Sequence, residues 1–149
     1  MEELQDQQIA DGTSLGIVRP RSITDFFAEP TDLDWKPEWR ALFMQMSLFA
    51  DAERKRLDKV PYRFSYRFEC DDARCKGHTK MIEDWEVGAL YLNVRSKCAT
   101  DEEAIALVRQ KFFDQMCGPE IDTHFFVGTI ARYPKSWVIL GVFWPKKEP

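Results

Sequence analysis

The sequence predicts a single α+β domain, in which a mostly antiparallel sheet of three to five strands carries two or three helices packed on one face. Residues 62–70 alternate aromatic and polar side chains, as a half-buried strand does. Residues 100–117 repeat apolar side chains at helical spacing. A chain of 149 residues, with 44% hydrophobic and 31% charged residues, has the size and composition of one ordinary globular domain.

The charge balance and the chain's first residues narrow the class of protein. The formal net charge is −4, which argues against a protein that wraps duplex DNA through phosphate contacts. No run of about 18 apolar residues is present, so no membrane span is expected. The first residues are acidic and polar, unlike a signal peptide. We therefore expect a cytoplasmic protein whose four cysteines are reduced.

The N-terminal part is expected to begin with a flexible segment over residues 1–13, followed by the domain over 14–149. Two short strands are predicted at 15–19 and 23–28, and Pro20 separates them.

A helix is predicted over residues 35–46, because Asp34 can cap it and Pro37 is tolerated in a first turn. Its apolar residues fall on one face at helical spacing: Trp35, Trp39, Leu42, Phe43 and Met46. The charged stretch that follows predicts an exposed connector at about 45–60.

The strand at 62–70 directs its aromatic side chains to one face and its polar side chains to the other. The first set is Tyr62, Phe64, Tyr66 and Phe68, with Cys70 after them, and the second is Arg63, Ser65, Arg67 and Glu69. A loop is expected from residue 71 to residue 80.

Two helices are expected after this loop. The first covers 81–96 and should bury one stripe of residues: Met81, Trp85, Ala89 and Leu92. The second covers 100–117, where Thr100 and Glu103 form a capping box and Gly118 with Pro119 ends the helix. Its inward residues are Ile105, Val108, Phe112 and Met116.

The chain closes with two predicted strands joined by a turn at 133–136. The second of them is nearly all apolar, which favours a central position in the sheet.

Three residues in or directly before the predicted loop at 71–80 are of the types that bind zinc. Cys70, Cys75 and His78 have the spacing C-x4-C-x2-H, and thiolate and imidazole are ligands that zinc prefers. A fourth ligand is required, for which Cys117 and His124 are the candidates. The spacing is not that of a standard zinc finger, so the alternative is a set of structural cysteines in a reduced protein.

Asp84 and Glu86 are weak candidates for a catalytic carboxylate pair. Residues two apart lie on different sides of a helix, so a helix at 81–96 would prevent them from sharing an ion. The alternative is that they complement the dipole at the start of that helix.

A group of basic residues precedes the aromatic strand, namely Arg54, Lys55, Arg56 and Lys59. Proteins that bind single-stranded nucleic acid combine such cations with stacking aromatics. The strand's alternation, however, places aromatics and arginines on opposite faces, which favours a core and a solvated face.

The pentapeptide at 45–49 resembles the motif by which proteins bind bacterial sliding clamps, Gln-Leu-Ser/Asp-Leu-Phe. The resemblance covers Gln45, Ser47, Leu48 and Phe49, and Met46 replaces a leucine of similar size. It implies that Gln45 hydrogen-bonds the rim of the clamp pocket, while Leu48 and Phe49 fill its apolar subsites. Two large apolar anchors entering a preformed cleft give modest affinity, because the peptide must be ordered.

Longer stretches, "YRFECDDARCKGH", "EDWEVGALY" and "FFVGTIARYPKSWVILGVFWP", are similar to a bacterial family associated with mobile elements and phage defence. This resemblance implies a DNA-transaction setting and supplies no catalytic residues.

Two function hypotheses follow. One is a non-enzymatic accessory protein that docks on a protein partner, the sliding clamp, through residues 45–49, with nucleic acid as an indirect partner. The alternative is a metal-dependent nucleic-acid-processing enzyme with a zinc loop, or a subunit of a phage-defence complex.

Overall fold

A computed structural model describes residues 1–31 and 60–149. It confirms the α+β fold class, with two three-stranded antiparallel sheets in one small domain. The first sheet has the order β1-β5-β6 and the second the order β2-β3-β4. Their bounds are β1 Leu15–Val18, β2 Ser22–Pro30, β3 Tyr62–Glu69, β4 His78–Met81, β5 His124–Ile130 and β6 Tyr133–Phe143.

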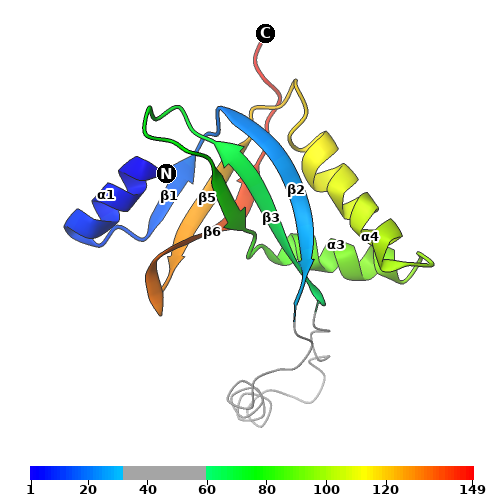
Figure 1. The fold of residues 1–149 in the computed structure, drawn as a ribbon. Coiled ribbons are helices and arrows are strands. Elements are labelled where there is room, and N and C mark those ends of the chain that lie inside the picture. The colour runs from blue at the N-terminus through cyan, green and yellow to red at the C-terminus, as the bar shows by residue number, and fades with distance from the viewer. Residues whose placement is uncertain (32–59) are drawn as a thin grey trace, which may run out of the picture.

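The helices of the described residues lie at the two sides of these sheets. Helix α1 lies beside β1 at one end of the molecule, and α4 lies beyond β2 at the other (Figure 1). None of these helices is long and apolar enough to cross a membrane. Their bounds are α1 Glu2–Asp11, α3 Trp85–Arg95, α4 Asp101–Arg109 and the π-helix η1 Gln110–Gln115, which continues α4.

Strands β2 and β3 form a long antiparallel pair. Pro30 pairs with Tyr62 at one end, and Ser22 pairs with Glu69 at the other. The chain from residue 32 to residue 59 joins the pair at the Pro30 end. The predicted helix at 35–46, the clamp-like pentapeptide and the basic residues at 54–59 lie outside the described residues.

The two sheets meet where β6 approaches the end of β4. Ile82 forms a parallel bridge with Ile139, and the backbone N–H of Glu83 donates to the Ile139 carbonyl at 2.7 Å. The prediction that this last strand is central to its sheet is wrong, because β5 is the central strand. Ile82 and Glu83 nevertheless cover the free edge of β6 at Ile139, which is fully buried.

Aromatic side chains dominate the core between the sheets and the helices. Tyr66 and Phe68 of β3 contact the ring of Phe125 in β5, with centroid distances of 4.9 and 5.1 Å. On the other side, Phe26 of β2 stacks on Phe112 of η1, and the buried Tyr66 hydroxyl donates to the Phe112 carbonyl. The predicted inward face of β3 is therefore confirmed for Phe64, Tyr66 and Phe68.

Helix α3 buries a different stripe from the predicted one. Its buried residues are Val87 and Tyr91, whereas Trp85 is 72% exposed. Asp84 sets this register by capping the helix, since its carboxylate accepts the N–H of Glu86 at 2.9 Å.

The helix predicted at 100–117 appears as α4 followed by η1, with Val108, Phe112 and Met116 buried. Thr100 accepts the N–H of Glu103 at 3.3 Å, as a capping box requires. The Glu103 carboxylate bonds the N–H of Ala99, one residue before the position that the motif predicts.

Three further local predictions differ from the structure. Residues 78–81, expected to end a loop and begin a helix, form β4. Residues 2–11, expected to be flexible, form α1, where Leu4 packs on Gly16 of β1 so closely that a Cβ at Gly16 would lie 2.6 Å from it. The last turn falls at 131–132, and residues 133–136 already belong to β6.

Candidate metal centre

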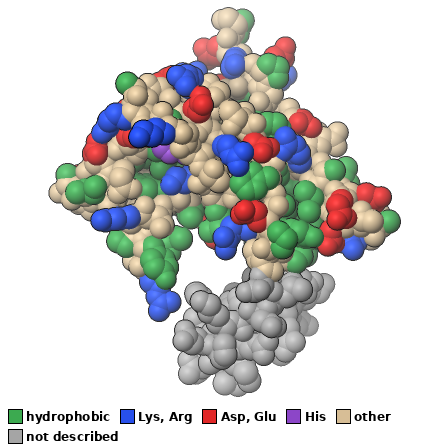
Figure 2. All heavy atoms as spheres, viewed as in Figure 1, with side chains coloured by type: hydrophobic (Ala, Val, Ile, Leu, Met, Phe, Trp, Pro, Cys, Tyr) green, Lys and Arg blue, Asp and Glu red, His purple; other side chains and the backbone are tan. Residues whose placement is uncertain are grey.

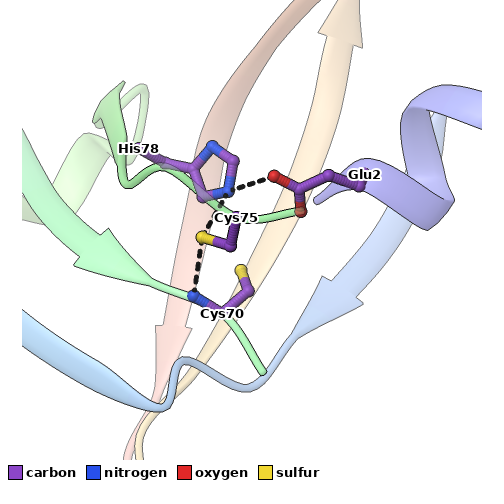
Figure 3. Close-up of side chains that lie close together, drawn as sticks. All are labelled: Glu2, Cys70, Cys75 and His78. Atoms are coloured by element: carbon purple, nitrogen blue, oxygen red, sulfur yellow. Dashed lines mark hydrogen bonds and ion pairs between the residues drawn. The ribbon is translucent and has the colours of Figure 1, made fainter. Parts of the chain in front are cut away.

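Four side chains from three parts of the fold converge at the Glu69 end of the β2–β3 pair. Glu2 is the first residue of α1, Cys70 follows β3, Cys75 lies in the loop after it, and His78 begins β4. Their ligand atoms all lie within 4.8 Å of one another. Figure 3 shows the four side chains pointing toward one another.

The β3–β4 hairpin explains why the three loop residues meet. Phe68 pairs with His78, so the intervening residues must turn back within a short loop. Gly77 makes part of this turn with a φ of 87°, a left-handed conformation that glycine adopts at little cost. The turn folds Cys75 back over Cys70, whose N–H donates to Cys75 Sγ at 3.2 Å.

The distances at His78 are close to those of two ligands on one ion. His78 Nε2 lies 3.4 Å from Cys75 Sγ and 3.1 Å from Glu2 Oε1. In a tetrahedral zinc site, zinc–ligand bonds of about 2.0 to 2.3 Å place nitrogen roughly 3.5 Å from sulfur and 3.3 Å from oxygen. These two distances therefore need shifts of only a few tenths of an ångström, whereas pairs near the 4.8 Å limit would have to close by about 1 Å.

The same geometry does not fit a nucleophilic triad. In a Cys–His–acid triad, one ring nitrogen faces the thiol and the other faces the carboxylate, which orients the ring. Here Cys75 Sγ and Glu2 Oε1 both approach Nε2 of His78. Convergence on one nitrogen is the arrangement of donor atoms around a shared cation.

Two backbone N–H groups converge on Cys75 Sγ, those of Cys70 at 3.2 Å and of Gly77 at 3.4 Å. Together with the contact to His78, they fix the position of this sulfur within the group.

Burial acts in opposite directions on two of the other side chains. It lowers the pKa of His78, which keeps the imidazole neutral and its lone pair available. It raises the pKa of the Cys70 thiol, so a metal bound there as thiolate would have to offset the cost of removing that proton. Burial also lowers the pKa of Lys80, which lies near Glu2.

The Glu2 carboxylate has one oxygen toward His78 and one toward the Met1 ammonium. Its Oε2 is buried and accepts no hydrogen bond from the described residues, but it forms an ion pair with the Met1 nitrogen at 3.5 Å. This ion pair offsets part of the cost of burying the carboxylate, and a cation bound at Oε1 would offset more of it. The residues present therefore fit a metal ion.

Glu2, and not Cys117 or His124, lies with Cys70, Cys75 and His78. Cys117 lies elsewhere, where its Sγ donates to the Phe112 carbonyl at 3.3 Å and burial raises its pKa to about 11. His124 Nδ1 lies 3.0 Å from the Asp122 carbonyl oxygen. No spacing rule could have found Glu2, because 68 positions separate it from Cys70 and only the folded chain brings them together.

Asp84 and Glu86 begin α3, with Asp84 as its cap and Glu86 in its first turn. Neither belongs to the group of metal-ligand atoms found among the described residues. Their positions fit the role of complementing the helix dipole.

The basic face of β3 is described only in part. Arg63 and Arg67 are exposed, and the Arg67 guanidinium lies 5.2 Å above the Phe27 ring. Arg54, Lys55, Arg56 and Lys59 are not among the described residues. Figure 2 shows basic and acidic side chains interspersed over one face of the molecule.

The chain belongs to the family described as a domain of unknown function, DUF8757, which matches residues 1–149. No curated protein and no solved structure matches the chain.

Proposed function

We propose that this protein is a zinc-binding accessory protein, in which the metal joins α1 to the β3–β4 hairpin. The observation that carries this proposal is the convergence of Glu2, Cys70, Cys75 and His78 within 4.8 Å. Structural zinc sites take four protein ligands, whereas catalytic sites leave one position for water or substrate. Four protein donors around one point therefore favour a structural role and not an enzyme.

The donor set selects zinc among the common metal ions. Two thiolates and an imidazole are soft or borderline ligands, which magnesium and calcium bind poorly. Zinc accepts sulfur, nitrogen and carboxylate oxygen together in a tetrahedral site.

The metal content of the purified, reduced protein tests this proposal. We expect about one zinc per chain by elemental analysis, and a loss of at least tenfold in affinity when Cys75→Ser or His78→Ala removes a ligand. Cys98→Ser is the matched control, because Cys98 lies outside the ligand group and should leave the zinc content unchanged. A wild-type protein without zinc, or variants that all retain it, would contradict the proposal.

A second candidate function is docking on a sliding clamp, which the pentapeptide at 45–49 favours. The described residues support it through the position of the peptide's segment in the fold. Its two ends are held together by one backbone hydrogen bond, in which the Thr31 N–H donates to the Pro61 carbonyl at 2.9 Å. Beside them, the Tyr62 hydroxyl donates to Asp101 of α4 at 2.9 Å. The segment is thus inserted at the opposite end of β2–β3 from the metal ligands.

Replacing Leu48 and Phe49 with alanine tests the docking function. Loss of two apolar anchors of about 2 kcal/mol each predicts at least a hundredfold weaker clamp binding, measured by surface plasmon resonance. The control is Leu140→Ala with Phe143→Ala, which removes two exposed apolar side chains of β6 and should leave binding unchanged. Unchanged binding by the first variant, or its unfolding in circular dichroism, would count against docking.

A further inference from the structure

We propose that Cys70 and Cys75 are a site of reversible oxidation, at which a peroxide joins them in a disulfide and expels the metal. This inference rests on the proposed zinc site and adds a chemical modification of that site. Three observations support it: the closeness of the two sulfurs, an open groove at Cys70, and the separation of the other cysteines.

The loop already holds the two thiols in position for a bond. The Sγ atoms lie within 4.8 Å of each other. Between them the chain turns tightly, since the Cys75 N–H donates to the Asp72 carbonyl at 2.9 Å. The Cys75 side chain curls toward Cys70, whose N–H it accepts. Because both residues lie in one short loop, the sulfurs can approach without movement of a strand.

Cys70 is 6% exposed and forms part of the wall of a groove that small molecules can enter. The groove has a volume of about 370 Å³ and runs between α1 and β1. Leu4 and Ile17 form apolar parts of the groove, and Arg19 and Asp72 form polar parts. Hydrogen peroxide is little larger than water, whose share of liquid volume is about 30 Å³, and so fits this space.

The other two cysteines lie apart from this pair. Cys117 contacts Phe112 in η1, and Cys98 follows α3, where the Cys98 N–H donates to the Arg95 carbonyl. Neither shares the ligand group with Cys70 or Cys75. The geometry thus favours one disulfide over the other pairings of four cysteines.

The reaction uses hydrogen peroxide as the oxidant and balances without another reagent. Cys70, as the thiolate that the proposed zinc would hold, attacks the O–O bond, so that an S–O bond forms, the O–O bond breaks and the departing hydroxide takes a proton to become water. The Cys75 thiolate then attacks the Cys70 sulfur, which forms the S–S bond and releases a second hydroxide to be protonated. Two thiolates lose two electrons, peroxide gains them, and two protons are consumed. The metal loses two of its ligands and dissociates.

The experiment treats the reduced, zinc-loaded full-length protein with hydrogen peroxide. We expect release of about one zinc per chain to a chromogenic chelator and loss of two of the four thiols. Peptide mapping should find Cys70 joined to Cys75, and a thiol reductant with added zinc should restore both counts. A Cys98→Ser/Cys117→Ser variant is the matched control and should respond like the wild type.

Several outcomes would overturn the inference. Zinc retained under peroxide, a disulfide that includes Cys98 or Cys117, or Cys70 oxidised without joining Cys75 would each contradict it. The zinc content before peroxide is measured separately. A reduced protein without zinc contradicts the proposed function. Peptide mapping after peroxide treatment still decides whether Cys70 and Cys75 form a disulfide.

Discussion

Removal of the proposed zinc by a chelator is expected to release α1 from the rest of the protein. In hydrogen exchange, the amides of residues 5–11 should lose their protection, while those of β3 and β5 keep it. The expected difference follows from how little else holds this helix, because no residue of α1 is buried. A helix of ten residues is marginal in water without tertiary support.

The other attachments of α1 are two partly buried contacts and one exposed ion pair. Leu4 packs on Gly16, the Gln5 side chain accepts the Trp137 indole N–H at 3.2 Å, and Asp6 pairs with Arg74 at 3.0 Å. Exposed ion pairs contribute little, and a single hydrogen bond contributes about 1 kcal/mol. Such contacts hardly offset the loss of backbone entropy when the helix is ordered. The bond from Glu2 to the metal would then decide whether α1 is docked.

The same removal should lower the melting temperature. A ligand present at a thousand times its dissociation constant stabilises the folded state by about 4 kcal/mol. At about 2 to 4 °C per kcal/mol for a chain of this size, the melting temperature should fall by roughly 10 °C. Differential scanning calorimetry with and without chelator measures this shift.

Two variants of α1 separate the metal from the helix itself. Glu2→Gln and Asp6→Asn each remove one negative charge from α1, but only Glu2 reaches the metal ligands. We expect the first to expose α1 to exchange in zinc-containing buffer and the second to leave it protected. Equal protection in both would show that the metal does not hold the helix.

The sequence predicted those structural features that depend on residues close together in the chain. Alternation at 62–70 located β3, because one face of this strand is buried under η1 and β5. Thr100 located the start of α4, because a cap acts on the next turn. The Cys70, Cys75 and His78 trio was found for the same reason, since one hairpin loop holds all three.

What the sequence could not predict depends on distant contacts. Trp85 fits the apolar stripe of a helix that begins at residue 81. Met81, however, belongs to β4 and pairs with Ser65 of β3, and the helix begins four residues later. The apolar run of β6 suggested a strand with a partner strand on each side. Its second neighbour is instead the bridge from Ile139 to Ile82, which neither segment indicates by itself. The sequence could not indicate Glu2, because Glu2 comes close to Cys70, Cys75 and His78 only in the folded protein.

The core position with the largest expected effect on stability is Phe26. Its ring is 1% exposed and lies between the β3 rings of Phe64, at 5.7 Å, and Tyr66, at 5.1 Å, and the η1 ring of Phe112, at 6.0 Å. Truncation to alanine leaves a cavity that strand β2 and helix η1 cannot both close. We expect Phe26→Ala to lower the free energy of unfolding by about 3 to 5 kcal/mol, measured by urea denaturation.

A matched substitution on the opposite side of the fold gives the control. Phe126 of β5 is 43% exposed, so Phe126→Ala removes the same atoms from a site that water already reaches, and should cost less than about 1 kcal/mol. Equal losses in the two variants would contradict the proposed core. Because Phe26 contacts none of the metal ligands, folded Phe26→Ala protein should still bind one zinc. Loss of the metal before unfolding would instead mean that the aromatic core and the metal site form one cooperative unit.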